Sequence, residues 1–138
     1  MSRVVALDLG SKRVGVAVSD PGQILATPHT VLSRGRSHAD DHKAVAAIVE
    51  EVGAERVVVG LPLQLDGRKG PAAEAALAEV DELSEVLPVP VETWDERLTT
   101  VAADRSMVAR GMKAPARRKV VDQVAAAVLL QSWLDRRG

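Results

Sequence analysis

The chain has 138 residues, long enough for one domain (residues 1–138) with a real hydrophobic core, and a formal net charge of -1. It contains no cysteine, which excludes disulfides and thiolate metal sites and favours a reducing, cytoplasmic setting. No apolar stretch approaches the ~18–20 residues that span a bilayer, and the N-terminus lacks the pattern of a signal peptide, so we expect neither.

The first third of the chain predicts strands. Val4–Leu9 is a short apolar run, and the valines at positions 14, 16 and 18 alternate with small or polar residues. The Gly-Ser-Lys-Arg stretch between the two runs predicts a turn, hence an antiparallel hairpin. A third strand is expected within Ile24–Leu32, where Pro28 indicates a sheet edge or a bulge.

The middle of the chain alternates helix and strand. Ser33–Asp41 is polar and predicts a loop whose Asp40 or Asp41 caps the next helix, and that helix should end at Gly53. Residues 56–62 form a continuous apolar run closed by glycine and proline, which is typical of a strand buried on both faces.

The last part predicts a helix over Ala72–Leu87, a strand over Val89–Trp94, a helix from residue 99 or 100 to about 109, and an apolar helix over Ala116–Leu134. The order strand, strand, strand, helix, strand, helix, strand, helix, helix predicts an α/β fold with a mixed central sheet flanked by helices. With only two tryptophans, valine, alanine and leucine must build the core, although we expect Trp133 to be part of it.

Asp8 is conspicuous because it lies inside an apolar strand. Burying an ionised carboxylate costs several kcal/mol unless it is paired or binds a metal. An ion pair with Lys12 or Arg13 across the hairpin is the alternative to a metal site.

Two further segments place acids in unusual positions. Asp122 lies at helical spacing from apolar residues of the last helix, namely Ala125, Ala126, Leu129 and Trp133. The alternative is a first-turn acid stabilised by the helix dipole. Asp95 and Glu96 follow a strand, at the end where sites of open α/β sheets form, and the alternative is a solvated pair held by Arg97.

Carboxylates from three separate segments favour a hard divalent cation. His29, His38 and His42 show no recognised metal spacing, so the donors are oxygens, which suit Mg²⁺ or Mn²⁺. Two such ions can promote phosphodiester hydrolysis. The sequence has neither a Walker A loop nor a G-x-G-x-x-G fingerprint.

The charges are unevenly distributed. Residues 70–96 hold eight acids and no base, whereas residues 110–137 hold seven bases and two acids. A near-neutral chain can therefore present a basic face to phosphates, or these segments are ordinary solvated helix surfaces.

Four motifs in this order resemble the YqgF/RuvX family of Holliday-junction-resolvase-like proteins, over nearly the whole chain. They are LDLGSKRVGVAVSD (residues 7–20), VVVGLPLQLDG (57–67), DERLTT (95–100) and DQVAAAVLLQ (122–131). The resemblance implies a ribonuclease H-like fold and a Mg²⁺-dependent nuclease linked to maturation of the 5′ end of 16S rRNA. An older proposal for the family is resolution of Holliday junctions.

The resemblance also implies roles for particular residues. Asp8, Glu96 with Asp95 beside it, and Asp122 match the metal-binding acids of ribonuclease H-like nucleases. Further positions are expected to contact substrate or hold its phosphates: Arg13, Arg97, Thr99, Arg34, Arg36, Arg68, Lys69, Lys113, Arg117, Arg118 and Lys119.

Three other functions fit parts of the pattern. A DNA junction resolvase would need a dimer with two sites, and the chain itself fits a monomer or a homodimer. A non-catalytic RNA-binding ribosome-assembly factor would bind RNA without the acids. The Asp-Leu-Gly-Ser stretch also resembles the phosphate loop of sugar-kinase and actin-like ATPases, but those need two such domains.

Overall fold

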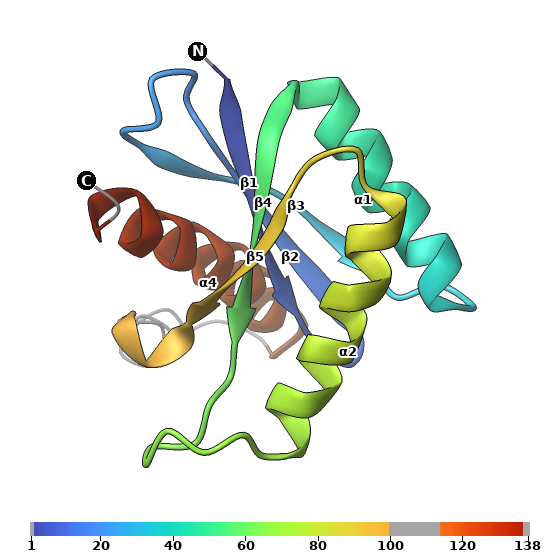
Figure 1. The fold of residues 1–138 in the computed structure, drawn as a ribbon, viewed down its shortest axis with the longest axis vertical. Coiled ribbons are helices and arrows are strands. Elements are labelled where there is room, and N and C mark those ends of the chain that lie inside the picture. Colours follow the sequence, from blue (N-terminus) through green and yellow to red (C-terminus); the bar gives the residue numbers. More distant parts are fainter. Residues whose placement is uncertain (1, 100–113, 137–138) are drawn as a thin grey trace.

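The computed structural model describes residues 2–99 and 114–136, with the side chains of the last helix described from Val124 onward. Within these residues, five strands form one sheet in the order β3-β2-β1-β4-β5 (Figure 1). The strands are β1 (Arg3–Leu9), β2 (Arg13–Ser19), β3 (Ala26–Ser33), β4 (Ala54–Leu61) and β5 (Val91–Asp95). The helices are α1 (His38–Val52), α2 (Pro71–Val86) and α4 (Ala114–Arg136), and a single 3-10 turn, η1 (Glu96–Leu98), follows β5.

The sheet is mixed, as predicted. β1 pairs with β2, and β2 with β3, in antiparallel fashion, whereas β1, β4 and β5 are mutually parallel. The carboxyl ends of these three parallel strands therefore meet at one end of the sheet, which is where α/β proteins build their sites.

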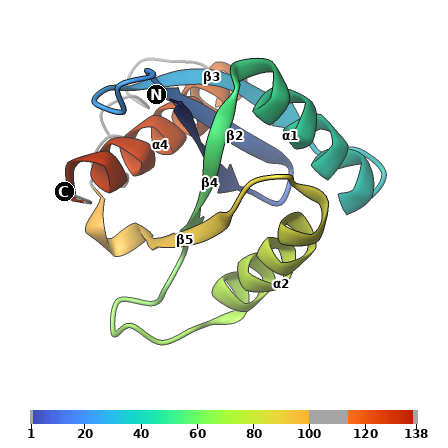
Figure 2. The same cartoon turned by 45° about the horizontal axis from the view of Figure 1, so that its top comes forward.

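Helices cover both faces of the sheet (Figure 2). Val5 and Leu7 of β1 pack in the core cluster beneath α1 and α2. Val4 and Ala6 pack in a second cluster with α4, as the alternation of strand side chains requires. Trp133 is 6% exposed in this second cluster, which confirms its predicted place in the core.

β3 is an edge strand, as Pro28 predicted. Its pairing with β2 shifts register between Val16 and Ala17, opposite Thr30 and Pro28, so proline lies at an irregularity of the edge. The strand spans Ala26–Ser33, slightly later than the predicted Ile24–Leu32.

The predicted start of α1 was wrong. The loop ends at Ser37, not at Asp41, and Ser37 rather than Asp40 or Asp41 caps the helix by accepting a hydrogen bond from the Asp40 amide at 3.2 Å. The reason is that the Asp41 carboxylate accepts the Gly35 amide instead, at 2.7 Å. The helix stops before Gly53, as predicted, because this glycine adopts a left-handed conformation (φ 68°).

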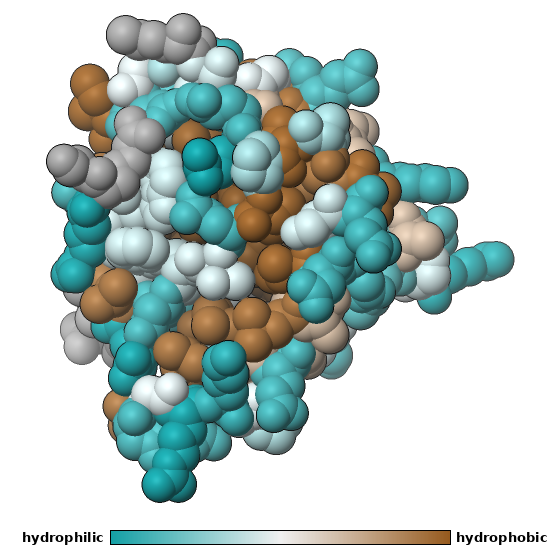
Figure 3. All heavy atoms as spheres, in the orientation of Figure 1, coloured by the Kyte–Doolittle hydropathy of each residue, from teal (hydrophilic) through white to brown (hydrophobic). Residues whose placement is uncertain are grey.

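β5 forms the other edge of the sheet and is shorter than predicted, beginning at Val91 rather than Val89. Hydrophobic residues gather in the middle of the face on which β5 lies (Figures 1 and 3). The helix α2 runs over Pro71–Val86, one residue earlier than predicted, with proline at its first position. Within the described residues, no helix has the length and apolar character needed to cross a membrane.

Candidate active site

Asp8 lies at the end of β1 that meets the ends of β4 and β5. It is the penultimate residue of the strand and is half-buried. Strand alternation puts it on the face of Val4 and Ala6, which α4 covers, because Leu9 packs on the opposite cluster. Its cross-strand partner on β2 is Gly15, so the neighbouring strand carries no side chain at this point.

Glycine is also the neighbour of Asp8 on β4. Leu7 pairs with Val59, so the parallel register puts Asp8 beside Gly60. A Cβ added to Gly60 would lie 2.6 Å from Glu96 Oε1 and 3.1 Å from Leu129 Cδ2. The Glu96 side chain therefore lies over the backbone of Gly60, on the face that α4 covers.

The fold thus brings together two of the predicted acids, which lie 88 positions apart in the sequence. Asp8 and Glu96 lie on the same face and at the same end of the sheet, with Gly60 of β4 between β1 and the turn η1. Such a pair of oxygen donors can bind a hard divalent cation.

Asp95 has a different partner. Its carboxylate accepts two bonds from Arg97 Nε (3.1 and 3.0 Å), one from Arg97 Nη2 (2.7 Å) and one from the Arg97 amide (2.9 Å). The side-chain bonds from Arg97 are the main cause that holds the pKa of Asp95 below its ordinary value, against a smaller effect of burial. The pair expected as an alternative thus exists between Asp95 and Arg97, whereas Glu96 turns toward Gly60.

Arg97 also connects two segments around the site. Its Nη1 donates to the Leu65 carbonyl at 3.4 Å and would lie 3.2 Å from a Cβ on Gly67, whose φ of 87° permits the turn. The loop after β4 and the turn after β5 are therefore held together, which restricts the position of Glu96.

η1, the turn that carries Glu96, is further anchored on α4. The indole Nε1 of Trp94 donates to Ser132 Oγ at 3.0 Å, and this hydroxyl donates to the Leu98 carbonyl at 3.0 Å. The Thr99 hydroxyl donates to the Glu96 carbonyl at 2.7 Å. Thr99, expected to contact substrate, has its hydroxyl engaged in closing this turn.

Asp122 belongs to α4, one turn before Ala126, but its side chain lies outside the described part of the chain. The same holds for the side chains of Arg117, Arg118 and Lys119. Lys113 and the helix predicted up to residue 109 fall within residues 100–113, which the structure does not describe. The roles assigned to these residues stay predictions.

The other basic candidates differ in their surroundings. Arg36 and Lys69 are exposed, and Arg68 pairs with Asp66 at 3.2 Å on the surface. Arg13 opens β2, where its carbonyl accepts the Gly10 amide at 2.9 Å. Arg34, in contrast, is only 16% exposed at its side chain.

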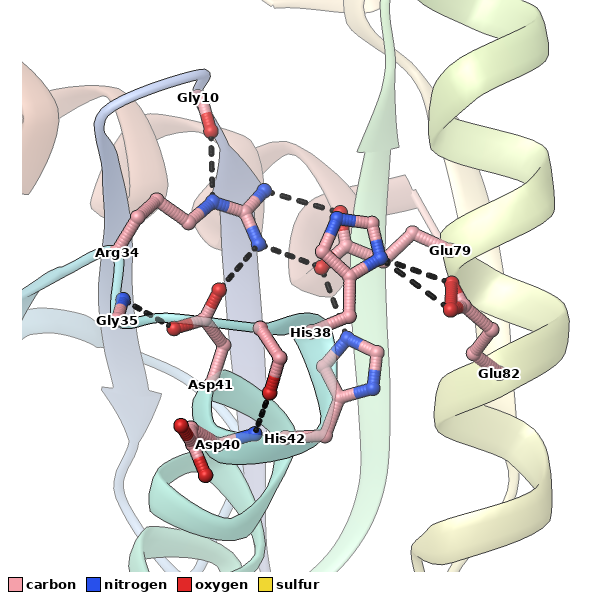
Figure 4. Close-up of polar contacts among 10 residues, drawn as sticks. Gly10, Arg34, Gly35, His38, Asp40, Asp41, His42, Glu79 and Glu82 are labelled. Atoms are coloured by element: carbon pink, nitrogen blue, oxygen red, sulfur yellow. Dashed lines mark hydrogen bonds and ion pairs between the residues drawn. The ribbon is translucent and has the colours of Figure 1, made fainter.

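Arg34 belongs to a charged cluster that sequence reasoning missed. The cluster comprises Arg34, Asp41, His42 and Glu79, with His38 and Glu82 at its rim (Figure 4). Nitrogen and oxygen atoms of His38, His42 and Glu79 lie within 4.8 Å of one another. The signal in the sequence was the four-residue spacing of His38 and His42, but it appears only when the helix begins at His38 instead of after Asp41.

Comparison with known proteins identifies the family. The family model described as RuvX, Holliday junction resolvase, matches residues 2–136. A relative from Mycolicibacterium paratuberculosis, named for pre-16S rRNA nuclease activity, is 49% identical over 136 residues, which cover 98% of this chain and 81% of that protein. A relative of the same name from Caldanaerobacter subterraneus is 43% identical over 134 residues, covering 96% of each chain.

Solved structures agree on the fold. RuvC of Thermus thermophilus, in complex with a Holliday junction substrate, matches with a TM-score of 0.61 at 15% identity, covering 98% of this chain and 96% of that one. A second structure of Thermus thermophilus RuvC matches with a TM-score of 0.57 at 16% identity, covering 98% of this chain and 95% of that one. The chain therefore has a ribonuclease H-like fold and belongs to the RuvX family, a family of nucleases and thus of hydrolases that act on phosphodiester bonds.

Proposed function

We propose that this chain is a cytoplasmic, divalent-metal-dependent nuclease that cuts structured RNA, with precursor 16S rRNA as its substrate, and that one domain (residues 1–138) carries the activity. The observation that carries the proposal is the convergence of Asp8 and Glu96 at one end of the sheet, on the same face. Relatives over nearly the whole chain bear the name of pre-16S rRNA nucleases, which supports the choice of substrate.

The residues present fit a hard cation. The donors are carboxylate oxygens, the type that Mg²⁺ and Mn²⁺ prefer. Gly60 supports the fit, because a Cβ at this position would lie 2.6 Å from Glu96 Oε1 and would displace the carboxylate. We assign Asp8, Glu96 and Asp122 as the metal-binding acids and leave Asp95 out, since Arg97 engages both of its oxygens.

Divalent cations bound by these acids would supply Lewis-acid stabilisation of the negative charge that develops at the scissile phosphodiester. The protein contributes rigid placement. β1 holds Asp8 through its ladder to two neighbouring strands, and the Arg97–Asp95 ion pair fixes the turn from which Glu96 extends. Preorganised donors avoid reorganisation during the reaction.

Basic side chains around this end of the sheet would hold the RNA backbone. We assign this role to the exposed Arg36, Arg68 and Lys69, to Arg13, and to the basic positions near the start of α4. Contacts with phosphates fix the register of a nucleic acid without reading its sequence, so they suit a substrate recognised by its shape.

The test is cleavage of precursor 16S rRNA fragments and of a four-way DNA junction, with Mg²⁺ and then Mn²⁺, by the wild type and by Asp8→Asn. We expect metal-dependent RNA cleavage by the wild type and none by the variant, with circular dichroism and thermal unfolding of the variant unchanged. Full activity of Asp8→Asn would contradict the proposed site. RNA binding without any metal-dependent cleavage would instead identify a non-catalytic assembly factor.

A junction resolvase is the second candidate, because the family model carries that description and RuvC shares the fold. Symmetric cutting of a junction needs two active sites, and therefore a dimer. Light scattering with and without junction DNA separates the two functions. A strict monomer that cuts RNA but leaves the junction intact would exclude resolution of junctions.

A further inference from the structure

The charged cluster on the α1 and α2 face is bonded directly to the turn that follows Asp8. Arg34 Nε donates to the Gly10 carbonyl at 3.0 Å, and Gly10 lies two residues after Asp8 (Figure 4). The Arg34 amide donates to the Lys12 carbonyl at 2.9 Å. A single residue thus contacts both ends of the turn between β1 and β2.

Arg34 is itself fixed by carboxylates from two helices. Its Nη1 and Nη2 reach the two oxygens of Glu79 on α2 at 2.6 and 2.9 Å, the two-pronged geometry that a planar guanidinium favours. Nη1 also donates to Asp41 of α1 at 3.2 Å. The guanidinium therefore ties the turn to α1 and α2 at once.

The carboxylates have supports of their own. His42 Nε2 lies 2.8 Å from Glu79 Oε2, and both side chains are buried. The Gly35 amide donates to Asp41 at 2.7 Å. Burial alone would raise the pKa of Glu79. The hydrogen bonds from Arg34 and His42 outweigh this effect and hold the pKa below its ordinary value, so the carboxylate stays ionised.

The turn offers little room to relax. The Gly10 amide donates to the Arg13 carbonyl at 2.9 Å, and a Cβ on Gly10 would lie only 2.7 Å from that oxygen. A displacement of this tight turn would pass to the end of β1, where Asp8 lies. Misplacement of a catalytic group by about 1 Å can lower a rate about a hundredfold.

We propose that Arg34 is a positioning residue, which holds the β1–β2 turn and through it the carboxylate of Asp8, with Glu79 and Asp41 as its anchors. The inference rests on the proposed nuclease function for the effect on rate, but the contacts that carry it are independent of that function. It assigns Arg34 a role within the protein instead of the phosphate contact expected from the sequence.

Two other uses of the cluster fit the geometry less well. His38, His42 and Glu79 are close enough to share a cation, but Arg34 already binds both oxygens of Glu79, and its positive charge would oppose a second cation. A pocket of about 490 Å³ opens beside the cluster, yet the guanidinium that lines it is already matched by two carboxylates. The cluster is therefore better described as an ion-pair network than as a metal or phosphate site.

The test compares Arg34→Lys and Glu79→Gln with the wild type in steady-state cleavage and in RNA binding. Lysine keeps the charge but lacks the several fixed N–H donors of a guanidinium, so it cannot contact Gly10 and Glu79 together. We expect each variant to lower kcat about 10- to 100-fold, as loss of a supporting contact does at other sites, with the RNA dissociation constant within about twofold of the wild type. Arg56→Gln is the control, because it breaks an arginine–glutamate pair, Arg56–Glu92 at 2.9 Å, at the opposite end of the sheet.

Amide hydrogen exchange supplies a readout that does not depend on activity. Arg34→Lys should accelerate exchange of the amides of Gly10 and of residue 34, whereas Arg56→Gln should not. A direct phosphate contact predicts a different pattern in binding: Arg34→Lys would weaken binding of RNA with little change in its salt dependence, because the charge is kept, and Glu79→Gln would strengthen binding.

Each outcome decides the matter. Full kcat in Arg34→Lys, or an effect confined to RNA affinity, would overturn the positioning role while the nuclease assignment stands. If the wild type cleaves no substrate, the proposed function fails, and unchanged exchange at Gly10 would then overturn the positioning role separately. Circular dichroism at the assay temperature confirms that each variant is folded.

Discussion

At one end of the molecule, the carboxylates on the two faces of the sheet have different neighbours. On the α4 face, Glu96 lies over Gly60, and Asp8 has glycines beside it on both neighbouring strands. On the α1 and α2 face, Glu79 lies against Arg34 and shares it with a second acid.

We infer a different use for each face: the glycines beside Asp8 and Glu96 fit the proposed cation site, whereas Glu79 and Asp41 on the opposite face are paired with Arg34. A glycine lets the carboxylate pack close against the backbone, in space that a side chain would otherwise fill. A carboxylate held by a guanidinium is matched within the protein and serves to fix the chain. Proximity of acids alone would not distinguish the two faces, whereas the residue type beside each acid does.

The largest expected difference in activity comes from replacing the two neighbouring acids, Glu96 and Asp95, one at a time. Glu96→Gln should lower kcat by about a thousandfold or more, because a metal-binding carboxylate supplies several kcal/mol to the transition state. Asp95→Asn should lower it less than about tenfold, since Asp95 faces Arg97. Steady-state cleavage of a precursor 16S rRNA fragment at saturating substrate and Mg²⁺ measures both.

Mg²⁺ titration sharpens the same comparison. Asp95→Asn should need the same Mg²⁺ concentration for half-maximal rate as the wild type. Equal losses in the two variants would mean that both acids are needed, and a greater loss in Asp95→Asn would mean that Asp95 is the ligand; either result would contradict the proposed contrast between the adjacent acids.

Sequence reasoning could propose Asp8 and the Asp95–Glu96 pair as site residues because each signal is local. A carboxylate in an apolar strand and two acids after a strand can be read directly from the chain, and so can the hairpin and the edge proline. The choice between Asp95 and Glu96 could not be read in this way, because it depends on a single 3-10 turn that directs one acid to Arg97 and the next over Gly60.

The cluster on the other face could not be predicted for a different reason. Its central bond joins Arg34 to Glu79, 45 residues apart, and nothing local in the sequence indicates that the two segments meet. The start of α1 was also predicted too late in the chain. Because Ser37 caps the helix, His38 is part of the helix and not of the loop before it. Interactions between distant segments depend on packing, which local patterns do not encode.

Gly60→Ala tests whether the space on the α4 face matters. The new Cβ would lie 2.6 Å from Glu96 Oε1, so the carboxylate must move, and we expect about a hundredfold loss of kcat with RNA affinity unchanged. Gly22→Ala is the control, because its Cβ would lie no closer than 3.1 Å to another atom, Asp20 Oδ2, in an exposed turn. A fully active Gly60→Ala enzyme would show that the glycine is not part of the site.

Glu79 tests the matched charges of the opposite face through stability. Its pKa lies below the unfolded value of 4.5, so its contribution is complete above pH 4.5 and is lost as the pH falls through the lower, folded pKa. Glu79→Gln should be less stable than the wild type near neutral pH by about 1.5–3 kcal/mol, the value of a hydrogen bond to a charged group. The two unfolding curves should converge in acid.

Urea unfolding at several pH values measures this convergence. Glu74→Gln is the control, an exposed acid of the same helix, and it should follow the wild type throughout. A constant difference between wild type and Glu79→Gln at all pH values would mean that the carboxylate is not held ionised by its partners.

The smallest effect is expected at the rim of the cluster, where His38 Nδ1 lies 3.0 Å from Glu82 and both side chains are about half exposed. The hydrogen bond with Glu82 is the main cause that raises the pKa of His38 above 6.5. The pair therefore stabilises the fold below pH 6.5, and this stabilisation is lost as the pH rises through the raised pKa. Exposed pairs contribute only about 0.2–1 kcal/mol, so NMR titration of His38 is the more sensitive measurement.

In that titration, Glu82→Gln should lower the His38 midpoint toward 6.5, whereas Glu85→Gln, another exposed acid of α2, should leave it unchanged. A wild-type midpoint at or below 6.5 would contradict the pairing. Unlike the buried contact between His42 and Glu79, the pair of His38 and Glu82 is exposed to solvent. The same chemistry fixes the chain where water is excluded and contributes little where the partners are solvated.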